Sequence, residues 1–303
     1  MRTFRIGTRG SSLAMCQARI VQTLLEERFP GLAFTLHTLS ATADRNPELP
    51  LTAMSGEGVF VKELESALAD QRIDLAVHSL KDLPLDLPES LRIAAVLERD
   101  EPRDAVVSRS GQGLDGLPRG SRIGTSSLRR RSQLLRHRSD IEMADIRGNV
   151  DTRLRKLDDG RYDAIVVAAC GLIRLGLDGR IAECLDFSIM LPEPGQGALA
   201  IEARADDADV NDLLRALDDA PTRASVEAER AFLRALGGGC HVPIAAYAAH
   251  VGEMLELEGA VVASDGHAQV RGQLSGPVSE PHALGDRLAN QLISQGAKEL
   301  LQS

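Results

Sequence analysis

Short apolar segments alternate with amphipathic ones along this 303-residue chain, and that alternation limits the possible folds more than any other feature. The apolar segments have the length of β-strands, and the segments between them carry apolar residues at helical spacing. Strands that alternate with helices build parallel sheets covered on both faces. We therefore expect an α/β fold with mainly parallel, doubly wound sheets. The pattern predicts strands at 4–8, 34–39, 74–80 and 92–97, and helices at 12–29 and 59–72.

The same alternation resumes after residue 103, and it contains a short repeat of an earlier sequence. Arg-Ile-Gly-Thr occurs at Arg5–Thr8 and again at Arg122–Thr125, and a serine-rich helix start follows each copy. A helix N-terminus offers backbone N–H groups to an anion. Two similar α/β domains are the simplest interpretation. The second half predicts strands at 104–108, 122–125, 141–146 and 163–169, and helices at 127–138 and 150–157.

The segments ERDEPRDA and LPEPGQG look like two crossings between these domains. From about Pro221 the pattern of predicted helices and strands changes. A helix is expected from about Arg223, capped by Thr222, to Leu236, with Gly237 as its C-cap. Strands at 255–264 and 268–274 and a closing helix from His282 complete a small α+β domain. We expect domain 1 at 1–98 plus 198–218, domain 2 at 103–192 and domain 3 at 221–303.

Composition excludes several classes of protein. A net charge of −9 argues against a general nucleic-acid binder. The N-terminus lacks the apolar core of a signal peptide, and no stretch is long enough to cross a membrane, so we expect a cytoplasmic protein. The four cysteines have neither CxxC nor zinc-type spacing, which predicts reduced thiols and no metal site.

Arginines cluster in this acidic chain, with nine Arg against four acids between Ser121 and Arg155. Ser127 stands at a predicted helix start, with Arg129 and Arg130 in the first turns. Cations there oppose the helix dipole, so an anion is expected nearby, although a solvated basic face is the alternative. Further arginines follow neighbouring strands, namely Arg9, Arg147 and Arg153. The expected ligand carries several carboxylates or phosphates and lies between the two domains.

Two further segments could carry chemistry. HSLKDLP follows a buried strand, where ligands of open α/β sheets bind, and it places Asp82 beside Lys81. A solvated strand-to-loop junction is the alternative. Cys240 follows three glycines and precedes His241. A free cysteine is usually an inert small hydrophobe, but Gly238 and Gly239 exceed what a helix cap needs. A metal site needs more ligands, which leaves a thiol available for covalent attachment.

Five segments occur in the order expected for the porphobilinogen deaminase (hydroxymethylbilane synthase) family, which the chain resembles over nearly its whole length. They are HSLKDLP, GTSSLRRR, RGNVDTRLRKLDDGRYDAIVVAACGLIRLGL, LPEPGQGALAIEAR and GGGCHVP. The resemblance implies two domains similar in topology to periplasmic binding proteins, and a small α+β third domain. It implies a transferase that condenses four porphobilinogens head to tail into linear hydroxymethylbilane, with loss of ammonia, in tetrapyrrole (haem) biosynthesis.

The resemblance also implies residue roles and a monomer. Cys240 would hold a dipyrromethane cofactor through a thioether. Asp82 would be the catalytic carboxylate, which hydrogen-bonds pyrrole nitrogens, assists loss of ammonia and stabilises the cationic methylene-pyrrolenine. Positions matching the family's cofactor site are Ser79, Lys81, Asp82, Ser127, Arg129, Arg130, Arg147 and Arg153. Positions matching its substrate site are Arg9, Gln17, Phe60, Arg147, Arg153, Arg174 and Gln196.

One segment departs from the family. Where Arg-Gly-Asp-like and Gly-Gly-Lys-Gly stretches are usual, 41–60 reads ATADRNPELPLTAMSGEGVF, with Ser55–Gly58 at the second site and Ala53 where lysine is common. Loss of positive charge from a loop over an anionic chain predicts weaker closure. This is the one feature that favours a non-catalytic paralogue, whereas Asp82 and Cys240 together favour the enzyme. An anion receptor of the periplasmic type would need a signal peptide and no Gly-Gly-Gly-Cys loop.

Overall fold

The computed structural model describes residues 3–39, 61–238 and 242–302. The chain divides into two compact units. Unit 1 comprises Met1–Arg99 and Ala198–Arg223, and unit 2 comprises Asp100–Gly197 and Ala224–Ser303. Both units contain a five-stranded mixed sheet, and unit 2 contains a three-stranded antiparallel sheet as well. We describe each unit by itself.

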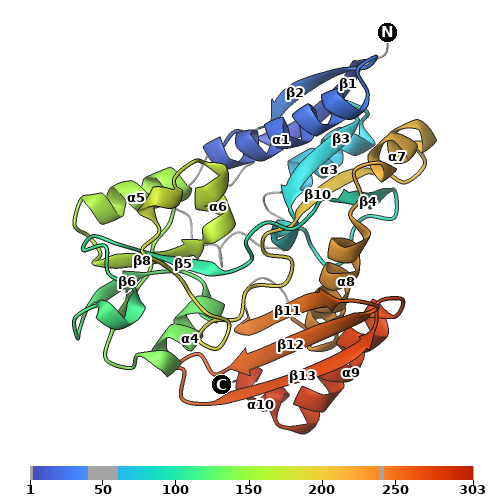
Figure 1. Ribbon diagram of the computed structural model, residues 1–303. Helices are drawn as coiled ribbons and strands as arrows, with labels where there is room; N and C mark the ends of the chain where they lie inside the picture. Colours follow the sequence, from blue (N-terminus) through green and yellow to red (C-terminus); the bar gives the residue numbers. More distant parts are fainter. Residues whose placement is uncertain (1–2, 40–60, 239–241, 303) are drawn as a thin grey trace. The chain divides into compact units, whose positions relative to one another are not determined.

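The sheet of unit 1 combines parallel and antiparallel neighbours. In spatial order its strands are β2 (Ala33–Leu39), β1 (Thr3–Arg9), β3 (Leu75–Ser79), β10 (Leu199–Arg204) and β4 (Leu91–Val96) (Figure 1). β1 is parallel to both β2 and β3, whereas β10 is antiparallel to β3 and β4. Four of these five strands run in the same direction, as the expected mainly parallel sheet requires, and β10, from a distant part of the chain, enters antiparallel between β3 and β4.

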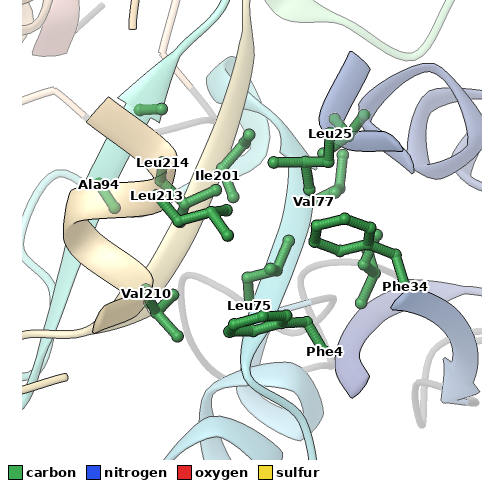
Figure 2. Close-up of a cluster of buried hydrophobic side chains, with 14 of the residues drawn as sticks. Phe4, Leu25, Phe34, Leu75, Val77, Ala94, Ile201, Val210, Leu213 and Leu214 are labelled. Atoms are coloured by element: carbon green, nitrogen blue, oxygen red, sulfur yellow. The ribbon is translucent and has the colours of Figure 1, made fainter. Parts of the chain in front are cut away.

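Side chains of each strand point alternately to the two faces of this sheet, and different helices cover the two faces. Helices α1 (Ser12–Arg28) and α7 (Ala208–Arg215) cover one face, and α3 (Lys62–Ala69) covers the other. Phe4 stacks on Phe34 with ring centroids 5.6 Å apart, and Figure 2 shows both rings among buried aliphatic side chains. Each such side chain contributes about 1.5–3 kcal/mol on burial. This core holds the strand ends from which the candidate site is built.

The mixed sheet of unit 2 has a similar arrangement of strands to that of unit 1. In spatial order its strands are β7 (Glu142–Ala144), β6 (Arg122–Gly124), β8 (Ala164–Ala168), β5 (Asp104–Ser108) and β9 (Glu183–Cys184). β6 is parallel to β7 and β8, and β5 is antiparallel to β8. Helix α4 (Leu128–His137) packs on one face, and α5 (Val150–Asp158) and α6 (Ala169–Arg174) pack on the other (Figure 1).

The antiparallel sheet of unit 2 consists of β11 (Ile244–Val251), β12 (Met254–Val262) and β13 (Gln269–Pro277). Helices α8 (Ala220–Ala235), α9 (Pro281–Ser294) and α10 (Ala297–Gln302) bury their apolar residues on it. Gly237 ends α8 with a φ of 70°, as its predicted capping role requires. This part of the chain has the expected α+β character.

The start of α8 differs from its prediction. The helix begins at Ala220, and the carboxylate of Asp219 accepts the backbone N–H of Thr222 at 2.8 Å. Asp219 therefore caps the helix, and Thr222 lies inside its first turn. Strand β11 was also not predicted, since its small residues give a weak apolar pattern. Across the described ranges, no helix is both long and apolar enough to span a membrane.

Candidate functional site

Unit 1 presents the HSLKDLP segment at the carboxyl end of β3. The strand ends at Ser79, and a short 3-10 helix, Leu80–Asp82, follows it. Leu80 and Leu83 are buried, and the backbone N–H of Leu80 donates to the carbonyl of Ala198 at 3.0 Å. These anchors leave Lys81 half-buried and Asp82 exposed. The fold thus fixes the backbone of the turn and leaves Asp82 exposed on it.

Other predicted residues of unit 1 gather at the same edge. β1 and β3 are parallel neighbours, so Arg9, at the end of β1, lies on the edge where β3 ends. The buried Gln17 of α1 donates from Nε2 to Oγ of Ser79 at 2.9 Å. The structure therefore places Arg9, Gln17, Ser79, Lys81 and Asp82 at one edge of unit 1, where the parallel strands β1 and β3 end.

A buried ionisable pair lies one residue before Ser79. Nε2 of His78 lies 3.0 Å from Oε2 of Glu202, and both side chains are buried. Burial raises the pKa of the nearby Glu65, and the charge of Glu202 raises it further. The sequence analysis did not single out Glu202. Its signal is a carboxylate between the apolar residues Ile201 and Ala203 of strand β10.

Unit 2 places its arginines at the start of α4. Ser127 is the N-cap, and its Oγ accepts the backbone N–H of Arg130 at 3.4 Å. Arg129 and Arg130 are 3% and 6% exposed, so the alternative of a solvated basic face is wrong for both. Both guanidinium groups contact the fully buried carboxylate of Asp104, which sequence reasoning missed. β5 runs antiparallel to β8, and its first residue therefore lies where the parallel strands end.

Positive charge still exceeds negative charge around this helix start. The half-buried Arg153 lies close enough to Arg130 that burial and the Arg130 charge lower its pKa to about 10. Among the described residues, Nε and Nη2 of Arg129 have no hydrogen-bond partner although both atoms are buried. An anionic ligand would stabilise both groups, because buried donors and like charges are costly when left uncompensated.

The other predicted residues of unit 2 have defined environments. Arg147 follows β7 and is half-buried, and its carbonyl accepts Nζ of Lys156 at 3.0 Å. Arg174, on α6, donates from Nε to Asp100 at 2.7 Å and from Nη2 to the carbonyl of Gly197 at 2.6 Å. Gln196 is fully buried and donates to Asp104 at 3.1 Å. Arg174 and Gln196 are therefore both held by hydrogen bonds to other residues of unit 2.

Cys240 and Phe60 lie outside the described residues, as does the whole 41–58 loop. Gly238 is the last described residue before Cys240. It lies in close contact with its surroundings, since an added Cβ would come within 2.6 Å of Cδ1 of Leu233. Close packing therefore explains this second glycine.

Each unit by itself presents groups that suit the binding of an anionic ligand. Unit 1 offers an exposed carboxylate beside a lysine, and unit 2 offers buried guanidinium groups at a helix N-terminus. Guanidinium groups bind carboxylates through parallel hydrogen bonds, and the helix end adds a favourable dipole.

Comparisons with known proteins agree across the chain. Residues 4–212 match the family described as porphobilinogen deaminase, dipyromethane cofactor binding domain, and residues 224–294 match the porphobilinogen deaminase C-terminal domain. The porphobilinogen deaminase of Desulforudis audaxviator is 50% identical over 98% of this chain and 96% of its own length. That of Syntrophobacter fumaroxidans is 46% identical over 99% of this chain and 97% of its own length.

Solved structures similar to the chain include the periplasmic aliphatic sulphonate binding protein SsuA from Escherichia coli. It is 17% identical, with a TM-score of 0.39 over 77% of this chain and 70% of that chain. The two family matches together span most of the sequence, and the curated relatives match it from end to end at about half identity. The chain belongs to the porphobilinogen deaminase family.

Proposed function

We propose that this protein condenses four porphobilinogen molecules head to tail into linear hydroxymethylbilane, with release of ammonia, and that Asp82 is the catalytic carboxylate. It is a transferase of tetrapyrrole biosynthesis, in accordance with its family. The observation that carries the role of Asp82 is an exposed carboxylate on a turn whose backbone is anchored by two buried leucines.

An anchored, exposed carboxylate can serve the reaction in two ways. It accepts hydrogen bonds from pyrrole N–H groups and stabilises the positive charge that develops on the ring as the carbon–nitrogen bond breaks and ammonia leaves. It then accepts the proton displaced when the new carbon–carbon bond forms. Lys81 and Arg9 lie at the same edge of unit 1, where Lys81 binds cofactor carboxylates and Arg9 binds substrate carboxylates.

The residues of this chain fit the family's dipyrromethane cofactor, whose pyrrole rings carry acetate and propionate groups. The fit rests on the buried Nε and Nη2 atoms of Arg129, which have no partner within the described ranges, and on the lowered pKa of Arg153. When bound, the cofactor supplies the pyrrole carbon to which the first substrate unit is joined. We assign its thioether link to Cys240 and its carboxylates to Ser79, Lys81, Ser127, Arg129, Arg130, Arg147 and Arg153.

Substrate binding is proposed for a second, overlapping set of residues. Gln17 and Arg9 contribute from unit 1, where Gln17 already holds Ser79. Arg174 and Gln196 contribute from unit 2, and their protein contacts fix their positions. The full proposed set is Arg9, Gln17, Phe60, Arg147, Arg153, Arg174 and Gln196.

We further propose a cytoplasmic monomer that acts without nucleic acid or membrane. The net charge of −9 supports the absence of a nucleic-acid partner. Three domains are proposed, at 1–98 plus 198–218, at 103–192 and at 221–303. The separate antiparallel sheet with its own core near the C-terminus supports the third.

The first experiment is the intact mass of the purified protein, followed by peptide mapping around Cys240. The expected excess equals two porphobilinogens less two ammonias, located on Cys240. An unmodified thiol calls for incubation with porphobilinogen and a second mass measurement. A protein that then gains the cofactor and forms product is the enzyme, whereas one that gains neither is a non-catalytic relative.

A further inference from the structure

Asp104 occupies the centre of the arginine cluster in unit 2. Its Oδ2 accepts Nη1 of Arg129 at 2.7 Å, and its Oδ1 accepts Nε and Nη2 of Arg130 at 2.9 and 2.8 Å. Nε2 of Gln196 donates to the same Oδ1 at 3.1 Å. The carboxylate is fully buried, and both arginines are more than nine-tenths buried. One side chain therefore fixes the direction of two guanidinium groups.

The two guanidinium groups meet Asp104 through different edges. Arg130 uses its Nε–Nη2 edge, whereas Arg129 uses only Nη1, which also donates to the carbonyl of Leu191 at 2.7 Å. The Nε–Nη2 edge of Arg129 is left without a partner in the part of the chain that the structure describes. That edge presents two parallel donors, the geometry in which arginine binds a carboxylate bidentately.

The charges lead to the same conclusion. A single carboxylate between Arg129 and Arg130 neutralises one of two positive charges, and Arg153 adds a third cation beside Arg130. Without Asp104, these guanidinium groups would repel one another, and their common orientation would be lost. With Asp104, the cluster keeps an excess of positive charge for an incoming anion.

We propose that Asp104 is a positioning residue of the cofactor site, which holds Arg129 and Arg130 so that the Nε–Nη2 edge of Arg129 receives a carboxylate of dipyrromethane. This inference rests on the proposed cofactor role of the two arginines. Asp104 acts through the arginines and has no direct contact with the ligand.

The test measures how fast the apoprotein acquires the cofactor when it is incubated with porphobilinogen, by intact mass over time. Asp104→Asn is expected to load about tenfold more slowly or worse, because it removes the charged partner of two buried guanidinium groups. Asp104→Glu, which keeps the charge but moves it, is expected to load at an intermediate rate. The matched control is Asp74→Asn, which breaks the ion pair of the buried Asp74 with the half-buried Arg5 in unit 1.

Melting temperatures separate positioning from folding. The proposal is supported if Asp104→Asn loads slowly while Asp74→Asn, destabilised to a similar degree, loads at the wild-type rate. It is overturned if Asp104→Asn loads normally, or if both Asn variants load equally slowly. Should Asp104→Asn fail to fold, Asp104→Glu decides, and wild-type loading by that folded variant overturns the proposal. Arg129→Lys tests the underlying site: normal loading there contradicts the cofactor role itself, whereas slow loading beside a normal Asp104→Asn contradicts only the positioning role.

Discussion

Nε2 of His78 lies 3.0 Å from Oε2 of Glu202, so two residues 124 positions apart in sequence form a buried ionisable pair in unit 1. The pair joins β3 to β10 one residue before Ser79. β10 reaches the sheet only after the chain has passed through residues 100–197 of unit 2. The contact therefore ties the strand that carries the Asp82 turn to the segment that returns from unit 2.

Loss of Glu202 is expected to destabilise unit 1. Glu202→Ala leaves the buried imidazole without its partner, which costs about 1–3 kcal/mol of unfolding free energy. Urea unfolding measures the difference, and the exposed Glu89→Ala is the control. A double-mutant cycle with His78→Ala isolates the coupling between the two side chains. Purely additive effects would contradict a direct interaction.

Asp74 predicts a stability contribution that depends on pH. Burial alone would raise its pKa, but the side-chain and backbone hydrogen bonds from Arg5 outweigh burial and hold the pKa below its ordinary value of 3.8. A carboxyl with a lowered pKa binds fewer protons in the folded state than in the unfolded state between the two pKa values. The stabilisation is therefore complete above the ordinary pKa and disappears as the pH falls through the folded one.

Asp74→Asn tests this sign directly. The variant is expected to be less stable than the wild type at neutral pH, and the difference should shrink as the pH is lowered below about 4. Urea unfolding at a series of pH values measures it. A difference that stays constant down to strongly acidic pH would show that the Arg5 interaction is not the cause.

Asp82→Asn is expected to leave the fold intact and to lower product formation by a factor of about 10²–10⁴, because the amide cannot take up the proton or stabilise the cation as the carboxylate does. The rate of hydroxymethylbilane formation measures the effect. Asp86→Asn, at another exposed aspartate four positions along the same loop, is the control and should remain active. Activity of Asp82→Asn within a few-fold of wild type would make the assigned role wrong.

Close packing of α8 against α9 predicts a glycine that cannot be replaced. A Cβ on Gly285 would lie 2.4 Å from the carbonyl oxygen of Ala228 and 2.6 Å from the backbone nitrogen of Phe232. Backbone atoms cannot move aside as a flexible side chain can, so Gly285→Ala should cost about 1–3 kcal/mol through overpacking. Thermal unfolding measures the loss. Gly179→Ala, where an added Cβ meets nothing within 4 Å, is the matched control.

Local structure could be predicted well where one pattern dominated. The first helix was expected at 12–29 and observed at Ser12–Arg28, and Ser127 begins α4 as its capping chemistry indicates. The one reversed strand of each mixed sheet, β10 and β5, could not be predicted, because an apolar run identifies a strand but not its neighbours. The start of α8 was misassigned because Asp219 and Thr222 are both good N-cap residues, and only the structure distinguishes them.

The candidate site was likewise predictable only in part. The end of a predicted strand placed Ser79 and Asp82 where ligands bind, and the family resemblance alone added Gln17, which contacts Ser79. The buried acids Asp104 and Glu202 could not be predicted as partners of other side chains. The sequence shows each as a single acid in a strand, and only the fold brings Arg129 and Arg130 to Asp104 and His78 to Glu202. Which cations of the arginine cluster are neutralised internally is likewise a property of tertiary structure.

Arg130→Ala tests whether the cluster binds carboxylates during chain growth. Removal of this guanidinium leaves Asp104 with Arg129 as its remaining arginine partner and takes one positive charge from beside Arg153. We expect lower activity, with enzyme-bound chains that accumulate at partly extended lengths because their carboxylates lose the attraction of one positive charge in the cluster. Mass spectrometry of the working enzyme measures the distribution of these chains. Arg131→Ala, at the next position of α4, is the control. A distribution in Arg130→Ala equal to that of the wild type would count against carboxylate binding at this arginine.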